Sequence, residues 1–568
     1  MILRRLVEYA ERLEAEGELT PVMYAAVPVR WQINLTEDGT LEGILPLGGD
    51  RKDNKRGNSV IVPNIVRAAG IKPKLLVDNG EYVLGIGRAG ADSDKVADRH
   101  AQFVELVQRC SDETDEGSVE AVAAFLGRWD AGEFRDDLPE EFDPQDNVGF
   151  RVRGVFPADR DSVKSFWAKS TTGEDSPEMT CLVTGAFGPV EQRLPVKVKG
   201  LTRIGGQAAG TSLISANAEP FESYGLKNSL TSPISRDAGE RFGKALNHLL
   251  ADEKTSLFIG PSVYVFWTRE QTGFDFASFL SRPEPETVKS LLGSPISGRE
   301  SHGVDGADFY ALALSASGGR AVVRDWLETT VPDAQENLKR WFRAQRVVDT
   351  RGEPGYPLGL FPLAAGAYRD AGKEMTPQVP AALVRAAIKG GRVPEDLLAR
   401  AVRRNRSEGD VSRQRAALMK LVLIYGGDAM AETLEELNPQ VEDPAYHCGR
   451  LLAELEELQR AAIPGVKATI VDRYYGAASS TPASVFGTLM RNHNSHVGKI
   501  RKERPGVGVA IQDRIGEITE KIGASFPTTL TMRRQAVFAL GFYHQRAHNR
   551  AEAKAAREAR ENKEGNQE

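Results

Sequence analysis

Cysteine is scarce in this chain, and its scarcity argues against two classes of protein. The 568 residues contain three cysteines, Cys110, Cys181 and Cys448, and no two of them form a CxxC pair. This spacing argues against a disulfide framework and against a thiolate zinc site. We therefore expect a reducing, cytoplasmic setting in which the three thiols are small core residues.

Long apolar runs and a strong net charge are also lacking. No segment approaches the ~20 apolar residues that a membrane-spanning helix needs. The start, MILRRLVEYAERL, is a charge-laced amphipathic pattern without the apolar core of an export signal. The net charge of -6 gives no overall basic signal, so any binding of a polyanion must come from local patches. We expect no membrane partner.

Signatures of catalysis are missing as well. The sequence contains neither a GxSxG elbow nor a phosphate-binding GxxxxGK[ST] loop. Gly85, Gly87 and Gly90 form a GxGxxG pattern, but they run directly into Asp92 and Asp94, whose charges would repel a pyrophosphate. The pattern therefore predicts a turn that leads into a helix.

His493 and His496 lie one helical turn apart and suggest a shared metal. No HExxH motif and no adjacent His–Asp pair accompanies them, and the nearby Lys499 and Arg501 would disfavour a cation. We expect no catalytic residue, no metal and no other cofactor. A nuclease or nucleic-acid-modifying enzyme with a dispersed metal site remains the alternative, and a purely structural scaffold is a third.

The hydrophobic pattern changes along the chain and predicts an α+β fold. Segments such as VPVRWQINL and VYVFW predict short strands in a mixed N-terminal domain, and DFYALALSASGGRAVVRDW predicts a hairpin. After Trp326 the pattern is mostly helical, and four amphipathic segments predict a C-terminal four-helix bundle. The expected parts are an α+β domain at 1–325, a helical connection at 326–429, the bundle at 430–552 and a charged, disordered tail at 553–568.

Basic residues gather in a few segments that are also rich in Gly, Asn and Gln. One is the segment 181–267, which contains VKVKGLTRIGGQAAGTSLISAN and shows no spacing typical of acid–base or metal chemistry. The others lie at 50–74 and 491–504. Lysine and arginine suit phosphate contacts, and amide side chains suit base edges. These segments predict a surface that binds a polyanion, and the alternative for the charge run at 50–74 is an ordinary solvated face.

Ordered blocks along nearly the whole chain resemble the large subunit of the type I-C CRISPR surveillance complex (Cascade). The blocks include MILRRLVEYAERL, VPNIVRAAGIKPKLLVDNGEYVLG, CLVTG…GGQAAGTSLISANAEPFESYG, LALSASGGRAVVRDWLETTV and RRQAVFALGFYHQR. One departure is visible, because family members usually read SFN where residues 215–217 read SAN. A role carried by that aromatic is therefore not transferred to Ala216.

The resemblance implies a non-catalytic subunit of a crRNA-guided antiviral ribonucleoprotein. Such a subunit would read the protospacer-adjacent motif in double-stranded DNA, aid strand separation and stabilise the R-loop, while RNA pairing supplies the remaining specificity. Its partners would be target DNA, the displaced single strand, the crRNA-bearing backbone subunits, a small subunit and the helicase-nuclease. The C-terminal bundle would resemble that small subunit, which an internal start at Met430 would also produce alone.

The predicted DNA-binding residues come from the basic segments. The loop Lys52–Asn64, with Gly205–Gln207 and Asn217–Asn228, is expected at the duplex that contains the motif, and the cations near residue 500 at the displaced strand. Basic side chains are assigned to phosphates and amides to base edges. The set is Lys52, Lys55, Arg56, Asn58, Asn64, Lys199, Arg203, Gln207, Asn217, Lys227, Asn228, Lys499, Arg501, Lys502 and Arg504.

Overall fold

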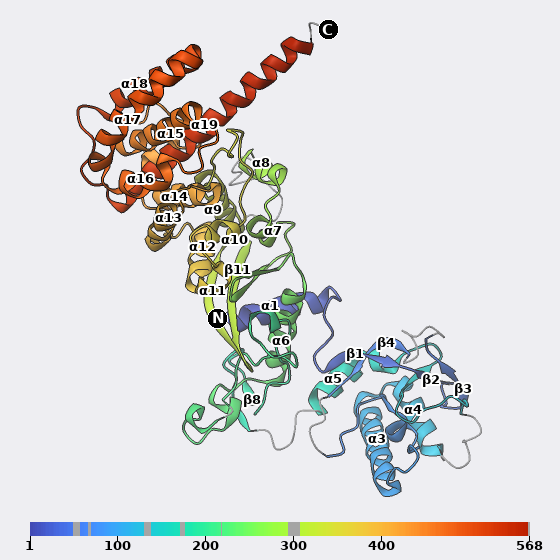
Figure 1. Cartoon of the computed structure of the whole chain (residues 1–568). Helices are drawn as coiled ribbons and strands as arrows, with labels where there is room; N and C mark the ends of the chain where they lie inside the picture. The colour runs from blue at the N-terminus through green and yellow to red at the C-terminus, as the bar shows by residue number, and fades with distance from the viewer. Residues whose placement is uncertain are drawn as a thin grey trace. The chain divides into compact units, whose positions relative to one another are not determined.

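The chain divides into two compact units (Figure 1). The first consists of Met1–Val198 and Ser212–His248, and the second of Lys199–Thr211 and Leu249–Glu568. The short segment Lys199–Thr211 therefore belongs to the second unit although its neighbours in sequence belong to the first. The computed structural model describes residues 1–48, 57–65, 70–129, 138–170, 177–216, 218–293 and 307–565.

The first unit is built around a four-stranded mixed sheet. Its helices and strands are α1 (Ile2–Ala15), β1 (Tyr24–Val29), β2 (Trp31–Leu35), β3 (Leu41–Pro46), β4 (Asn58–Pro63), β5 (Val77–Asn79), α2 (Gly80–Val83), α3 (Ser93–Thr114), α4 (Gly117–Arg128), β6 (Asn147–Val152), α5 (Asp161–Ser170), β7 (Glu178–Thr180), β8 (Phe187–Pro189) and α6 (Arg236–Ala251). The strand order is β3–β2–β6–β5, with β2 and β6 parallel, and β1–β4 and β7–β8 form separate antiparallel pairs. Trp31, Phe103 and Phe150 belong to its core.

The predicted turn at the GxGxxG pattern is confirmed. Gly85 and Gly90 have φ of +66° and +78°, values that favour glycine. The chain then enters α3, whose first N–H groups at Asp94 and Lys95 are capped by the carboxylate of Asp92. Asp92 therefore serves as a helix cap.

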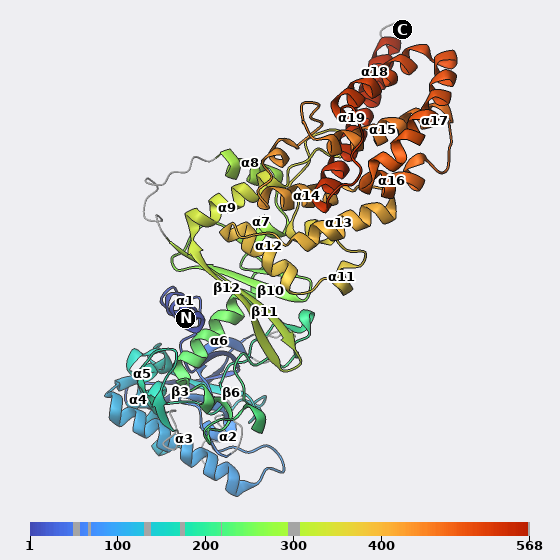
Figure 2. The same cartoon turned by 90° about the vertical axis from the view of Figure 1, so that its left-hand side faces the viewer.

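The second unit combines a four-stranded antiparallel sheet with a helical part (Figure 2). Its elements are β9 (Ser256–Ile259), β10 (Ser262–Thr268), α7 (Phe276–Ser281), α8 (Pro285–Gly293), β11 (Asp308–Ser317), β12 (Arg320–Thr330), α9 (Val331–Ala344), α10 (Leu360–Ala365), α11 (Ala371–Glu374), α12 (Gln378–Lys389), α13 (Glu395–Glu408), α14 (Arg413–Tyr425), α15 (Pro444–Ala462), α16 (Ile470–Ser480), α17 (Pro482–Glu503), α18 (Pro505–Ile522) and α19 (Met532–Gly565). The α+β fold class is confirmed, and so is the predicted hairpin, which is β11–β12.

The sheet of the second unit has strand order β12–β11–β10–β9. One face contributes Leu257, Tyr264 and Ala313 to a hydrophobic core that continues through the helices as far as α19. Directly opposed residues in antiparallel strands point to the same face. The row Phe258, Val263, Leu314 and Val323 is opposed in this way and lies on the other face.

The C-terminal helices follow the prediction, with additions. The four helices expected from the hydrophobic pattern are α15, α17, α18 and α19, and α16 is a further one that begins with a capping box between Thr469 and Asp472. The helix α19 continues through the charged segment that was expected to be disordered, as far as Gly565. Ala, Glu, Lys and Arg dominate that segment, and all four have high helix propensity.

The helices α15 and α19 approach each other backbone to backbone. A Cβ built on Gly449 would lie 2.0 Å from the carbonyl oxygen of Phe538, and one built on Gly541 would lie 2.0 Å from that of Tyr446. No side chain fits at such a distance, so the two glycines set how closely these helices pack.

Replacing Gly541 by alanine is expected to destabilise the second unit by about 1–3 kcal/mol or more, because the helices must separate to admit the methyl group. Thermal unfolding followed by circular dichroism measures the effect. The matched control is Gly487→Ala in α17, where a built Cβ meets no described atom within 4 Å. That change should be neutral or stabilise by about 0.5–1 kcal/mol. Equal melting temperatures for the two variants would contradict the close packing.

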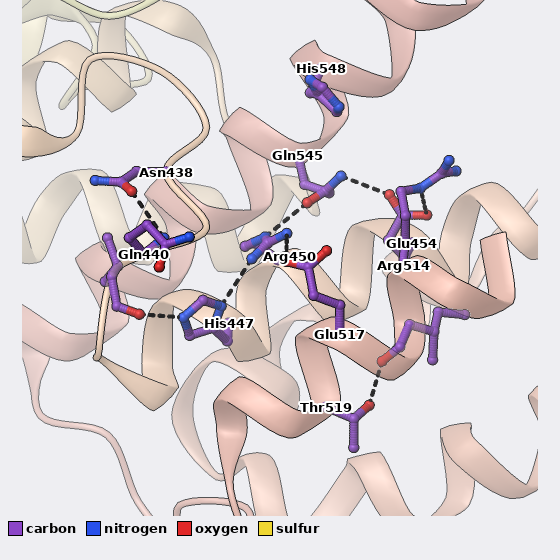
Figure 3. A network of polar contacts seen from close by, with 12 residues as sticks. Asn438, Gln440, His447, Arg450, Glu454, Arg514, Glu517, Thr519, Gln545 and His548 are labelled. Atoms are coloured by element: carbon purple, nitrogen blue, oxygen red, sulfur yellow. Dashed lines mark hydrogen bonds and ion pairs between the residues drawn. The ribbon is translucent and has the colours of Figure 1, made fainter. Parts of the chain in front are cut away.

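A buried polar network joins three helices of the bundle (Figure 3). Arg450 on α15 donates from Nε to Oε1 of Gln545 on α19 at 2.9 Å, and its other nitrogens face Nδ1 of His447 at 3.2 Å and Oε1 of Glu517 on α18 at 3.6 Å. Gln545 Nε2 in turn donates to Oε1 of Glu454 at 2.8 Å. All of these side chains except Glu517 are buried, so the network fixes α18 and α19 against α15.

The contacts of His447 assign its tautomer. Its Nε2 lies 2.5 Å from the carbonyl oxygen of Val441, which can only accept, so Nε2 carries the proton and Nδ1 accepts from Arg450. Burial lowers the pKa of His447 despite this hydrogen bond. The ring is therefore a neutral structural part of the network.

The cysteines are buried, as the sequence predicts. All three are free and buried. Burial raises the pKa of the Cys110 and Cys448 thiols to about 12, which keeps both in the unreactive thiol form.

Candidate nucleic-acid interface

Two segments that are far apart in sequence meet at the end of the β11–β12 hairpin. The N–H of Gly318 donates to the carbonyl oxygen of Gly205 at 3.1 Å, and Gly206 and Gly318 form a parallel bridge. Beside this contact, a Cβ built on Gly319 would lie 3.5 Å from Oε1 of Gln207. We call residues 199–211 together with 315–324 the basic ribbon.

The basic ribbon concentrates positive charge. It contains four cations and no Asp or Glu, and the cations are Lys199, Arg203, Arg320 and Arg324. The guanidinium of Arg203 lies 5.2 Å from the ring centre of Phe258, and Nε of Arg324 donates to Oγ of Ser315 at 2.6 Å. Neither Arg203 nor Arg324 forms an ion pair with any residue in the described part of the chain. Their charge is therefore not neutralised within the ribbon.

The cations occupy both faces of the hairpin. Arg203 packs over Phe258, which shares a face with Leu314 and Val323. Side chains alternate between faces along a strand, so Ser315, which accepts from Arg324, lies on the opposite face. A two-stranded ribbon with cations on both faces matches a nucleic-acid groove, which has a phosphate backbone on either side.

Sequence reasoning missed Arg320 and Arg324. Two arginines within a strand are not a charge run, and the segment was interpreted only as a hairpin. The available signal was the stretch 315–324, SASGGRAVVR, which carries two cations and no acid.

The predicted residues of the first unit are spread out. Asn58 begins β4 and is exposed, and Asn64 follows the end of that strand with its N–H bonded to the carbonyl of Met23 at 2.7 Å. The two asparagines are six residue steps apart along an extended strand, a distance of about 20 Å, so they cannot read the same base pair. Lys227 is exposed and Asn228 is half-buried in the loop before α6.

Four predicted residues lie outside the described part of the chain, namely Lys52, Lys55, Arg56 and Asn217. At the position where family members usually carry an aromatic residue, this chain has Ala216. Ala216 is buried, in keeping with its small apolar side chain.

The cations predicted near residue 500 form a second surface. We call residues 499–504, where α17 ends and α18 begins, the bundle tip. Its four cations are exposed, and none forms an ion pair with the described residues. The α17 C-terminus favours cations because its terminal carbonyl groups carry partial negative charge. Both views place the bundle at the opposite end of the second unit from the β11–β12 hairpin (Figures 1 and 2). The four cations are Lys499, Arg501, Lys502 and Arg504.

The histidine pair in α17 has no third ligand among the described residues. Within that part of the chain, no three His, Cys, Asp or Glu side chains gather as a metal-ion site. Nδ1 of His493 already faces the carbonyl oxygen of Met490 at 2.7 Å. Among the described helices, none is both long and apolar enough to cross a membrane.

Comparison with known families places the chain among the CRISPR-associated proteins. Residues 6–549 match the family model described as CRISPR-associated protein (Cas_Csd1), and since the match covers nearly the whole chain, the protein belongs to that family. The resemblance to the type I-C large subunit is thereby confirmed. No curated protein matches the chain.

Proposed function

We propose that this protein is the non-catalytic large subunit of a crRNA-guided type I-C CRISPR complex in the cytoplasm. In this role it binds double-stranded target DNA, reads the protospacer-adjacent motif, aids strand separation and R-loop stabilisation, and helps to recruit the helicase-nuclease. Membership of the Cas_Csd1 family supports the complex. The observation that carries the DNA-binding role is the basic ribbon, in which two distant segments unite four cations without a carboxylate.

The ribbon suits duplex DNA better than a single strand. A two-stranded β-ribbon fits the major groove, where cations on its faces meet the phosphates on either side. Glycines at the tip, Gly318 and Gly319, let the backbone approach closely. The amide of Gln207 beside them suits an adenine edge, which makes it our candidate for reading the motif.

The bundle tip is proposed to hold the displaced strand. Its exposed cations suit the sugar–phosphate backbone of a single strand, for which electrostatic attraction supplies much of the affinity. We also propose that the bundle corresponds to a small subunit, which an internal start at Met430 would produce as a separate chain. An immunoblot of the native gene's products against the C-terminus should show this shorter chain, and full-length protein alone would contradict it.

Removing two tip cations should weaken single-strand binding. We expect Lys502→Ala with Arg504→Ala to lose about 25-fold in affinity for single-stranded DNA at 0.1 M salt, at ~0.7 log units per contact and decade of salt. The matched control is Arg460→Ala with Lys554→Ala, since both of these cations already pair with carboxylates, at 2.8 and 2.7 Å. Equal affinities for the two double variants, measured by fluorescence anisotropy, would contradict the assignment.

The proposed function is tested against the enzymatic alternative in one assay. The purified chain is incubated with labelled DNA and divalent metals, and the assembled complex is offered duplexes with randomised flanking sequence. We expect no cleavage by the chain alone and selection of one flanking motif by the complex. Cleavage that His493→Ala abolishes would favour a nuclease, and binding without any motif preference would contradict motif reading.

A further inference from the structure

Tyr224 stands at the tip of a tight turn in the first unit. The N–H of Leu226 donates to the carbonyl oxygen of Ser223 at 2.9 Å, and these two residues form an isolated antiparallel bridge. The residues between them, Tyr224 and Gly225, have φ of +54° and +71°. Positive φ at both central positions is the geometry of a type I′ turn.

This geometry disfavours the residue that occupies the tip. Type I′ turns prefer Asn, Asp or Gly at the first central position, because larger side chains crowd the backbone at positive φ. The Tyr224 side chain is 100% exposed, so it gains no packing in return. A Cβ built on Gly225 meets no described atom within 4 Å, so the turn stands clear of its surroundings. Because the positive φ of Tyr224 costs free energy and its side chain gains no packing within the protein, we interpret the position as a functional one.

Hydrogen bonds hold the base of the turn. A carboxylate oxygen of Glu222 accepts from the N–H of Asn228 at 3.3 Å, and the N–H of Ser229 donates to the carbonyl oxygen of Gln192 at 3.0 Å. The turn therefore presents the aromatic ring from a fixed base, which lowers the entropy lost when a partner binds.

We infer that Tyr224 binds nucleic acid by stacking its ring on an unpaired nucleobase. The inference rests on the proposed function, which supplies an unpaired strand. A flat, exposed ring matches the face of a base, and such stacking tolerates any sequence. Lys227, exposed three residues further on, suits a phosphate of the same strand. The neighbouring carboxylate of Glu222 is already engaged by the Asn228 N–H.

Two substitutions distinguish the contribution of the Tyr224 ring to binding from the contribution of the turn to folding. Tyr224→Phe keeps the ring, whereas Tyr224→Asn removes it and creates Asn-Gly, the preferred pair for this turn. Tyr224→Asn should therefore melt at or above the wild-type temperature, so that any loss of binding is not a loss of folding. Phe187→Ala is the matched control, since Phe187 is 71% exposed but does not have a positive φ.

The test measures affinities of the assembled, guide-loaded complex for target DNA in which single abasic sites are moved along the unpaired strand. We expect Tyr224→Asn to weaken binding about tenfold or more, and Tyr224→Phe and Phe187→Ala to change it little. At one position, removal of the base should cost the same factor, and Tyr224→Asn should add nothing further.

Other outcomes overturn the inference. Base stacking is excluded if Tyr224→Asn binds DNA with unchanged affinity. It is also excluded if Tyr224→Asn weakens binding by the same factor at every abasic position. Failure of Tyr224→Asn to enter the complex, with normal folding, would assign the ring to a protein partner instead. If wild-type complex binds DNA and ribbon variants weaken it while Tyr224→Asn does not, only this inference fails. If wild type binds no DNA, the proposed function fails with it.

Discussion

Replacing Arg203 and Arg324 together by alanine is expected to reduce the affinity for duplex DNA by about sixtyfold at 0.1 M salt. Each phosphate contact changes the logarithm of affinity by ~0.9 per decade of salt, which is about eightfold per cation at this concentration. The slope of log affinity against log salt should fall in magnitude by about 2. Anisotropy titrations of the assembled complex over several salt concentrations measure both quantities.

The control for the ribbon variant removes cations that are already neutralised. Lys373 is exposed and Arg400 is half-buried, and they pair with Asp370 and Asp396 at 3.0 and 3.2 Å. The double change Lys373→Ala with Arg400→Ala should leave the affinity and the salt slope nearly unchanged. A ribbon variant that behaves like this control would show that the ribbon does not contact DNA phosphates.

The largest effect on stability is expected from Arg450→Ala. Arg450 is 2% exposed, and its removal leaves the acceptors on Gln545 and His447 buried without donors. Breaking a buried charged network by removing one member costs about 3–5 kcal/mol. This loss should lower the melting temperature of the second unit by roughly 5–10 °C in calorimetry.

Two further variants test this explanation. Lys502→Ala removes an exposed cation from the same bundle and should change stability by less than about 0.5 kcal/mol. Replacing Arg450, Glu454 and Gln545 together by Met, Met and Leu removes the arginine together with the side chains of Gln545 and Glu454, so that of the two stranded acceptors only Nδ1 of His447 remains. This triple variant should therefore be more stable than Arg450→Ala. If the triple variant were the least stable, the cost of Arg450→Ala would not come from unpaired buried acceptors.

Local patterns predicted much of the fold. The α+β class, the β11–β12 hairpin and four of the C-terminal helices follow from periodicity and from the glycine pair Gly318–Gly319, because these signals lie within a few residues of each other. The helix α16 was missed because it is short and borders the amphipathic segments. The tail was expected to be disordered from its charge, although its helix propensity is high.

The candidate site was only half predictable. Arg203 and Gln207 were selected from composition. The segment that carries them contacts the hairpin tip through Gly205 and Gly206, which pair with Gly318, a residue far away in the sequence. No local pattern encodes such a pairing, so Arg320 and Arg324 could not be recognised as parts of the same surface. The strain at Tyr224 was likewise invisible, because a single positive φ depends on the turn around it.

Site-specific photocrosslinking from position 319 tests the central claim most directly. A Cβ at Gly319 makes only ordinary van der Waals contact with Gln207, at 3.5 Å, so a photoreactive residue fits there. In the assembled complex on target duplex, we predict crosslinks to nucleotides of the flanking motif. Crosslinks confined to protein subunits, with none to DNA, would contradict the assignment of the basic ribbon to the duplex.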